Sequence, residues 1–318
     1  MIANHYRQSS LIDSFMPKVP QNEFLNNIQK FVDFESFRNI LDACYSHEGR
    51  PACDPIILFK MLLLERWYRL SDREVVANVE DRITFRKFLC LELGGDVPDD
   101  TTLVRFRERL DKNKLFDKLI NKFEEQLAKH NINIKAGSIT IVDATLMEAN
   151  TRQKQNDPTH VERLDPGAEI VNRPPKGPIT GYKVHISMDA KTRMISQFEV
   201  TGAARAEVEH LLVPFGAEAI LADKGYHSAK NRRKLKALGV RDCIMKRGAR
   251  AHPLSEKDKQ RNKTISPCRS KIESKFGEMK KWHGLGRAIY RGIQRVAGQV
   301  AMTILAVNMK RLVALMPV

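Results

Sequence analysis

The sequence predicts an α/β protein in which a mixed β-sheet with flanking helices is preceded by an all-α N-terminal domain. Residues 22–130 carry apolar residues at helical spacing, whereas the chain from Ser138 onward contains short β-branched runs that alternate with helical segments. A chain of 318 residues is long enough for two domains. We therefore expect a helical domain over residues 1–135 and a sheet-containing domain, including a C-terminal helix, over residues 136–318.

The N-terminal part shows capping signals as well as helical periodicity. The run DPIILFKMLLLERWYRL has apolar residues at helical spacing, and Ser71 and Glu74 form a capping box at the start of the next helix. After the loop GGDVPDD, the helix TTLVRFRERL places Arg105, Arg107 and Arg109 largely outward. Two short helices followed by this Arg-bearing helix resemble a helix-turn-helix, in which Arg105 would contact a DNA groove. A helical bundle with a charged outer face explains the pattern equally well.

The first part of the second domain is predicted to be extended. ITIVDATL has the composition of a central strand, whereas residues 151–180 are rich in Pro and polar residues and are expected to form a long loop. GYKVHISMD then alternates strictly, with Lys183 and His185 on its polar face, and pairs with MISQFEV in a hairpin. We expect a helix over residues 205–214 to follow, and then a second buried strand, AILAD.

The remaining elements complete the pattern. They are a helix (SAKNRRKLKALG), a strand (CIMK), a basic loop, a long helix that begins near Pro267, and a mostly apolar helix over residues 292–315. The order strand, hairpin, helix, strand, helix, strand, helix is that of the ribonuclease H-like fold, so we expect a ribonuclease H-like mixed sheet.

The net charge of +16 is confined to one segment. Residues 224–291 hold 21 Lys and Arg against 5 Asp and Glu, whereas the rest of the chain holds 33 of each sign. Such a concentration is typical of a surface that binds phosphates, and it favours double-stranded DNA over an anionic membrane because the basic residues do not lie on one amphipathic helix.

Several other classes of protein are disfavoured. Five cysteines without a C-x-x-C pair argue against a disulfide framework and a zinc ribbon, and they favour a reducing cytoplasm. No signal peptide is recognisable at the N-terminus, and the longest apolar run, residues 297–307, is shorter than a membrane span, so no membrane is expected. KGPITGYK has the wrong spacing for a nucleotide-binding phosphate loop.

Three acidic residues are candidates for a catalytic metal site. Asp143 lies in the first buried strand and Asp223 ends the second, so pairing these strands would bring two carboxylates together. The helix RSKIESKFGEMKKW offers a third acid, Glu273, with Arg269 and Lys280 on the same helical face. Three carboxylates suit Mg²⁺ or Mn²⁺, and two such ions can promote phosphoryl transfer on a nucleic-acid backbone without a protein nucleophile.

These motifs resemble a known family. IVDAT, LADKGY and R-x3-E-x6-K are similar to motifs of the DDE transposases of bacterial insertion sequences, most closely the insertion-sequence-five family, and occur in order with gaps of 80 and 50 residues. The resemblance covers nearly the whole chain. It implies Asp143, Asp223 and Glu273 as the catalytic, metal-binding triad. Ser266 departs from the pattern, because the family has a tyrosine there whose contact with DNA would be lost.

The resemblance also implies DNA-contacting residues and a reaction. The residues matched to basic or aromatic family positions are Lys224, Tyr226, Arg269 and Lys280. On the hairpin, Lys183 and His185 either contact DNA or lie on an ordinary exposed face. The implied reaction is cleavage at inverted-repeat transposon ends, followed by transfer of the 3′-hydroxyl into target DNA by a homo-oligomer acting on the bacterial nucleoid. Two alternatives remain open: a structure-specific or hybrid nuclease of the same fold, and a domesticated, non-catalytic DNA-binding protein.

Overall fold

The computed structural model describes residues 22–45, 53–132, 138–150, 161, 164–175, 177–248 and 253–316. The chain divides into two compact units, one formed by Met1–Asn131 with Ala301–Val318 and the other by Ile132–Val300. This division differs from the expected one at the C-terminus, where residues 301–318 join the helical unit. The expected end of the helical part at residues 135–137 lies outside the described residues, as do residues 151–160 of the expected long loop.

The described elements of the first unit are helices. They are α2 (Glu23–Phe31), the 3₁₀ turn η1 (Glu35–Phe37), α3 (Arg38–Asp42), α4 (Pro55–Tyr68), α5 (Asp72–Asp81), α6 (Ile83–Leu89), α7 (Asp100–Lys112) and α8 (Phe116–Lys129). Helix α4 is mostly apolar and almost entirely buried, so it forms the centre of this unit, with Lys60, Glu65 and Arg66 buried among its apolar residues. The capping box at α5 is confirmed, because Ser71 accepts from the Glu74 N–H and Glu74 accepts from the Ser71 N–H.

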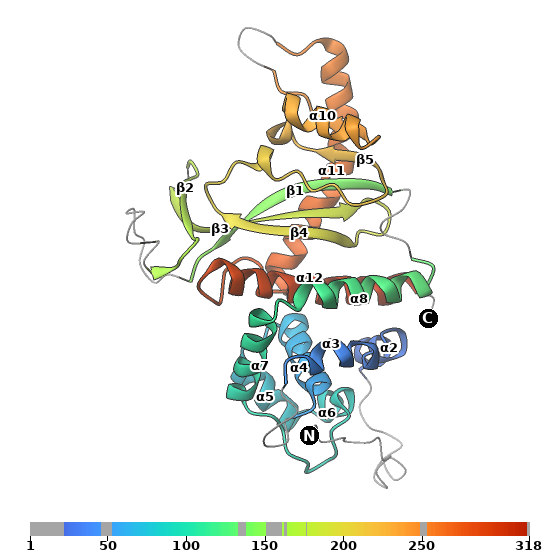
Figure 1. Ribbon diagram of the computed structural model, residues 1–318, viewed down its shortest axis with the longest axis vertical. Helices are drawn as coiled ribbons and strands as arrows, with labels where there is room; N and C mark the ends of the chain where they lie inside the picture. Colours follow the sequence, from blue (N-terminus) through green and yellow to red (C-terminus); the bar gives the residue numbers. More distant parts are fainter. Residues whose placement is uncertain are drawn as a thin grey trace. The chain divides into compact units, whose positions relative to one another are not determined.

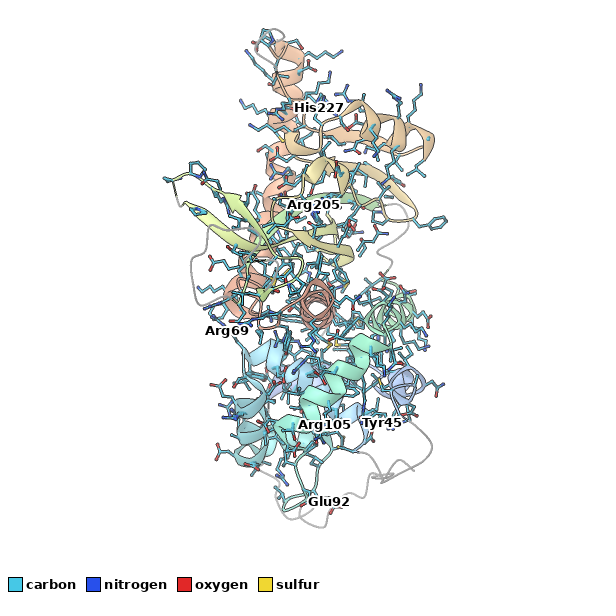
Figure 2. All side chains as sticks on the ribbon, turned by 60° about the vertical axis from the view of Figure 1, so that its left-hand side comes forward. Tyr45, Arg69, Glu92, Arg105, Arg205 and His227 are labelled. Atoms are coloured by element: carbon cyan, nitrogen blue, oxygen red, sulfur yellow. The ribbon has the colours of Figure 1, made fainter. Side chains whose placement is uncertain are left out.

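Helix α7 presents only part of its arginine row to solvent. Arg105 is exposed, as expected (Figure 2). The outward position expected for Arg107 is wrong, because its guanidinium is buried and lies 3.1 Å from Glu65 Oε1 on α4. Helical periodicity cannot distinguish a solvated arginine from one that neutralises a buried acid, since both are polar residues on the same helix.

The second unit contains a six-stranded mixed sheet (Figure 1). Its strands are β1 (Ser138–Glu148), β2 (Glu169–Asn172), β3 (Pro178–Asp189), β4 (Ile195–Gly202), β5 (Ala217–Ala222) and β6 (Arg241–Ile244). The order is β2-β3-β1-β5-β6, and β4 pairs with the same edge of β3 as β2 does, farther along the strand. Strand β1 is antiparallel to β3 and parallel to β5, and β5 is parallel to β6.

Helices connect and cover this sheet. The 3₁₀ turns η2 (Glu207–Glu209) and η3 (Lys224–Tyr226) flank β5, α10 (Ala229–Ala237) precedes β6, and α11 (Glu256–Trp282) contacts β1 and β5 (Figure 1). A core of apolar side chains joins β1, β5, β6 and α10, and it includes Val142, Ile220, Leu235 and Ile244.

Three expected elements of this unit are corrected. The expected helix over residues 205–214 is only the turn η2. Side chains of α10 bind backbone carbonyls of this segment instead: Asn231 Nδ2 donates to Val208 O and Lys234 Nζ donates to Leu211 O, each at 2.9 Å. The long helix does not begin near Pro267 but at Glu256, where Ser255 caps it. A short strand, β2, lies within the segment that was expected to be a loop.

The last helix, α12 (Ile293–Leu315), follows the expected range closely. Among the described residues it is the one helix whose length and composition would let it cross a membrane. However, 78% of its most apolar 18-residue window is buried within the structure, as is usual for a core helix.

Candidate active site

The end of strand β5 brings two acids next to each other. Strands β1 and β5 run parallel, and their last paired residues are Val142 and Ala222. The next residues in the two strands are Asp143 and Asp223, and at this point β5 ends whereas β1 continues. Asp143 is therefore a strand residue whose side chain lies where its neighbouring strand stops, which explains how a buried strand accommodates an aspartate.

Helix α11 contributes the third acid and a shared cation. Arg269 Nη2 lies 2.9 Å from Asp143 Oδ2 and 3.0 Å from Glu273 Oε1, and Arg269 Nη1 lies 3.6 Å from Asp223 Oδ2. The i,i+4 spacing on α11 places Arg269 and Glu273 on one face of the helix. The three acids predicted from the sequence thus lie around one arginine. Arg269 is 126 positions after Asp143 in the chain.

Burial and mutual repulsion disfavour the charged forms of these acids when no cation is near them. Burial raises the pKa of the Asp143 carboxyl above its usual range, and the negative charge of Asp223 raises it further, whereas Arg269 opposes both effects. Burial by itself lowers the pKa of Arg269, but Asp143 and Asp223 more than compensate and raise it. The guanidinium is therefore held in its charged form by the acids around it.

Tyr226, which follows Asp223 closely, is also part of this site. Its side chain is 0% exposed, and its hydroxyl has no hydrogen-bond partner in the part of the chain that the structure describes. Burial raises the pKa of this hydroxyl, and the charges of Asp143 and Asp223 raise it further. The ring packs in the core with Val142, so the DNA contact that the resemblance implies for Tyr226 does not fit its buried position.

The donor set of this site fits a divalent cation. Its three carboxylates supply the hard oxygen ligands that Mg²⁺ and Mn²⁺ prefer, and one positive charge, the Arg269 guanidinium, now lies among them. An unpartnered buried hydroxyl beside them is a further polar group that a hydrated ion would satisfy. Over the described ranges no three acidic, His or Cys side chains are grouped to bind one ion directly. A metal ion would therefore require Arg269 to withdraw from the carboxylates.

A cavity of about 510 Å³ opens beside Asp223. Its walls come from the η3 turn, the segment after β6 and helix α11; the lining residues are Asp223, Lys224, Gly225, Met245, Lys246, Arg247, Gly248, Leu254 and Asn262. Lys224 is exposed, and Lys246 Nζ lies 2.7 Å from Asp258 Oδ1. The cavity thus combines Asp223 with the cationic residues Lys224, Lys246 and Arg247 in its lining, which is suitable for a phosphate chain.

The two hairpin residues predicted as DNA contacts are not free at the surface. His185 is fully buried. Its Nε2 lies 3.0 Å from Thr201 Oγ1, and the centroids of its ring and the His210 ring are 4.6 Å apart. Lys183 is 12% exposed, and its Nζ lies 3.7 Å from Glu207 Oε1. The exposed face expected for these residues is wrong, because the segment after β4 covers the side of β3 that the alternation pattern marked as polar.

The other predicted DNA contacts lie in separate places. Lys280 is half-buried on α11, two turns beyond the Glu273 position, and exposed Arg105 lies on α7 in the other unit (Figure 2). Ser266, at the position where the resemblance leads one to expect tyrosine, is exposed on α11 one turn before Arg269.

An acid that the sequence analysis did not single out also lies at the site. The carboxyl of Glu207, in the turn η2, has a raised pKa because of burial and because Asp143 and Asp223 lie near it, whereas Lys183 opposes the shift. The only sequence signal is its position in the chain between the first two acids, and many acids that are not in the site share such a position.

Comparison with known proteins agrees with this geometry. Residues 134–309 match the family model of the transposase DDE domain, and residues 13–109 match that of a transposase domain (DUF772). Among solved structures, the chain resembles a piggyBac transposase in a synaptic complex with hairpin DNA, with 12% identity and a TM-score of 0.47 over 92% of this chain and 72% of that one. That likeness is too weak to support an assignment. The family match alone covers more than half of the chain, and the protein therefore belongs to the transposase DDE domain family.

Proposed function

We propose that this protein is a DNA transposase that cleaves at the inverted-repeat ends of its element and transfers the 3′-hydroxyl into target DNA. The observation that carries the proposal is the convergence of Asp143, Asp223 and Glu273 on one guanidinium in a chain of this family. Acids from two strands and a helix would otherwise repel one another, so their common position requires a cation.

The proposed role of the three acids is to hold Mg²⁺ or Mn²⁺, and two ions are expected. When bound, such ions would supply the charge stabilisation and the activation of the attacking oxygen that an in-line displacement at phosphorus needs. Asp143 is fixed for this role by its strand and by the Ala144 N–H, which donates to its Oδ1 at 2.9 Å. Glu273 is 61% exposed on α11, where Arg269 Nη2 lies 3.0 Å from its Oε1.

The DNA would contact the basic segment over residues 224–291, which contains all of the net positive charge. The cavity beside Asp223 lies in this segment, and its exposed Lys224 is suited to a phosphate near the scissile one. Helix α10 adds further exposed cations, among them Lys230 and Arg233. Sequence-independent contacts of this kind position DNA, whereas recognition of the inverted repeats would need base contacts elsewhere.

The finer assignments rest on the sequence. The order of strands and helices supports a ribonuclease H-like fold, and the motifs IVDAT, LADKGY and R-x3-E-x6-K support membership of the insertion-sequence-five group. We assign recognition of the transposon ends, oligomerisation or both to the helical unit, where Arg105 is an exposed candidate for a base contact. The expected site of action is the bacterial nucleoid, with the protein as a homo-oligomer on paired ends.

The test uses the DNA that flanks the gene. Oligonucleotides carrying its inverted repeats would be incubated with the full chain and Mg²⁺ or Mn²⁺, and cleavage, strand transfer and end binding would be measured separately. Asp143→Asn should abolish cleavage and strand transfer while changing end binding less than about threefold, because one oxygen ligand is lost and the fold is kept. Glu218→Gln is the matched control, since Glu218 is an exposed acid of β5.

Each other outcome overturns part of the proposal. Full activity in Asp143→Asn would remove the metal-binding role. Cleavage of the ends without joining would identify a nuclease, and end binding by the wild-type chain without metal-dependent cleavage would identify a DNA-binding protein.

A further inference from the structure

Glu207 lies where three parts of the active-site unit meet. It belongs to the turn η2 that follows β4, and its Oε1 lies 3.7 Å from the Nζ of Lys183 on β3. The same ammonium donates to the backbone oxygen of Arg205 at 2.6 Å (Figure 2). Lys183 therefore binds the backbone of this segment and also pairs with Glu207. The Lys183 side chain is mostly buried, at 12% exposed, and this burial strengthens its interaction with Glu207.

The other oxygen of Glu207 reaches the turn that carries Asp223. A Cβ placed on Gly225 would lie 2.9 Å from Glu207 Oε2, so this oxygen is next to the backbone of the D-K-G-Y segment. Asp143 and Asp223 are both near enough for their charges to raise the pKa of Glu207, after burial, which is the larger cause. The charge of Lys183 opposes these effects. The Glu207 side chain is thus partly exposed, at 32%, and places one oxygen beside Lys183 and the other beside the turn that follows Asp223.

The hydroxyl of Tyr226 provides a second, independent observation. It is buried without a hydrogen-bond partner among the described residues, and burial, followed by the charges of Asp143, Glu207 and Asp223, raises its pKa. An unpartnered buried hydroxyl costs about 1–3 kcal/mol. A hydrated cation bound by the acids near this hydroxyl would give it a hydrogen-bond partner.

We propose that Glu207 is a fourth acidic ligand of this site and supplies a carboxylate oxygen to a divalent cation held with Asp143 and Asp223. The inference rests on the proposed metal-binding function and extends it, because a triad of acids becomes a set of four. While no metal is bound, Lys183 pairs with Glu207, and Arg269 pairs with the other acids.

Titration of the full chain with Mn²⁺ by calorimetry, without DNA, tests the proposal. Glu207→Gln should weaken Mn²⁺ binding at least about tenfold or reduce the number of ions bound, since loss of even an outer partner of a metal site has an effect of about 10–100-fold. Glu209→Gln is the matched control, because Glu209 is an exposed acid of the same turn. Circular dichroism would verify that each variant is folded.

The outcomes separate this inference from the function on which it rests. If the wild-type chain binds no Mn²⁺, or if Asp143→Asn binds it as well as the wild type does, the proposed metal site itself fails. If Asp143→Asn loses binding but Glu207→Gln matches the wild type in affinity and in number of ions, Glu207 is not a ligand and the inference is overturned.

Lys183 distinguishes a ligand from a simple ion-pair partner. Lys183→Gln removes the cation that competes for Glu207, so it should tighten Mn²⁺ binding, and this gain should disappear when Glu207→Gln is added. If Lys183→Gln leaves the affinity unchanged, or if the gain persists in the double variant, Glu207 serves only to pair with Lys183. An unchanged affinity in Lys183→Gln overturns the inference even if Glu207→Gln alone fails to fold.

Discussion

Arg269 offers the sharpest test of the site, because one side chain neutralises three acids. We predict that Arg269→Gln makes the sheet-containing unit less stable in metal-free buffer and more responsive to Mg²⁺ than the wild-type protein. The reason is that the guanidinium lies where a cation is needed, within 3.6 Å of all three carboxylates. Its loss exposes their mutual repulsion, and it also removes the group with which a metal ion must compete.

The magnitude follows from the burial of each pair. Asp143 is buried, and breaking a buried ion pair costs about 3–5 kcal/mol. The pair with Glu273 adds at most about 1 kcal/mol, because that carboxylate is 61% exposed and solvent screens it. For a unit of this size 1 kcal/mol shifts Tm by about 2–4 °C, so a decrease of roughly 10–20 °C is expected. Mg²⁺ at 100 times its Kd would restore about 2.7 kcal/mol.

The assay is thermal unfolding with and without Mg²⁺. Lys263→Gln is the matched control, because Lys263 is an exposed cation on the same helix. Arg269→Gln should gain several degrees more from Mg²⁺ than either the wild type or the control. If Mg²⁺ stabilises all three proteins equally, Arg269 does not occupy a metal position and the reasoning is wrong.

Three further predictions concern other parts of the chain. Arg107→Ala should destabilise the helical unit by up to about 3–5 kcal/mol in chemical denaturation, because buried Glu65 would keep only Arg66, 3.5 Å away, as its cation; a change as small as that of exposed Arg73→Ala would contradict this. Burial, with the charges of His210 and Lys183, lowers the pKa of His185 to about 3, so this residue must stay neutral in the fold. Its contribution to stability is full above pH 6.5 and is lost as pH falls toward 3; between pH 7 and 5.5 the loss is about 1 kcal/mol, and His185→Gln should lack it. Lys224→Gln should reduce the salt dependence of DNA binding by about one unit of slope, and an unchanged slope would mean that Lys224 contacts no phosphate.

The sequence predicted the order of strands and helices because those signals are local. Alternation along β3, the capping box at Ser71 and the helical spacing around α4 depend on neighbours within a few residues. The approach of Asp143 to Asp223 was predicted for a similar reason, since parallel pairing of two buried strands fixes which of their ends meet. Even so, the start of α11 was placed too late, because Pro267 suggested a helix boundary that buried residues on both sides of it override.

The sequence alone therefore predicted which residue types make up the site. These are the acids Asp143, Asp223 and Glu273, together with the segment of residues 224–291 that holds the whole net charge. Only the tertiary structure decided which polar residues are exposed. His185 looks like a surface residue from the alternation of its strand but is buried, and Glu207 looks like an ordinary acid but lies beside Lys183 and the turn that carries Asp223. The physical reason is that burial and ionic partners depend on segments remote along the chain, whereas periodicity reports only which residues of one element share a face.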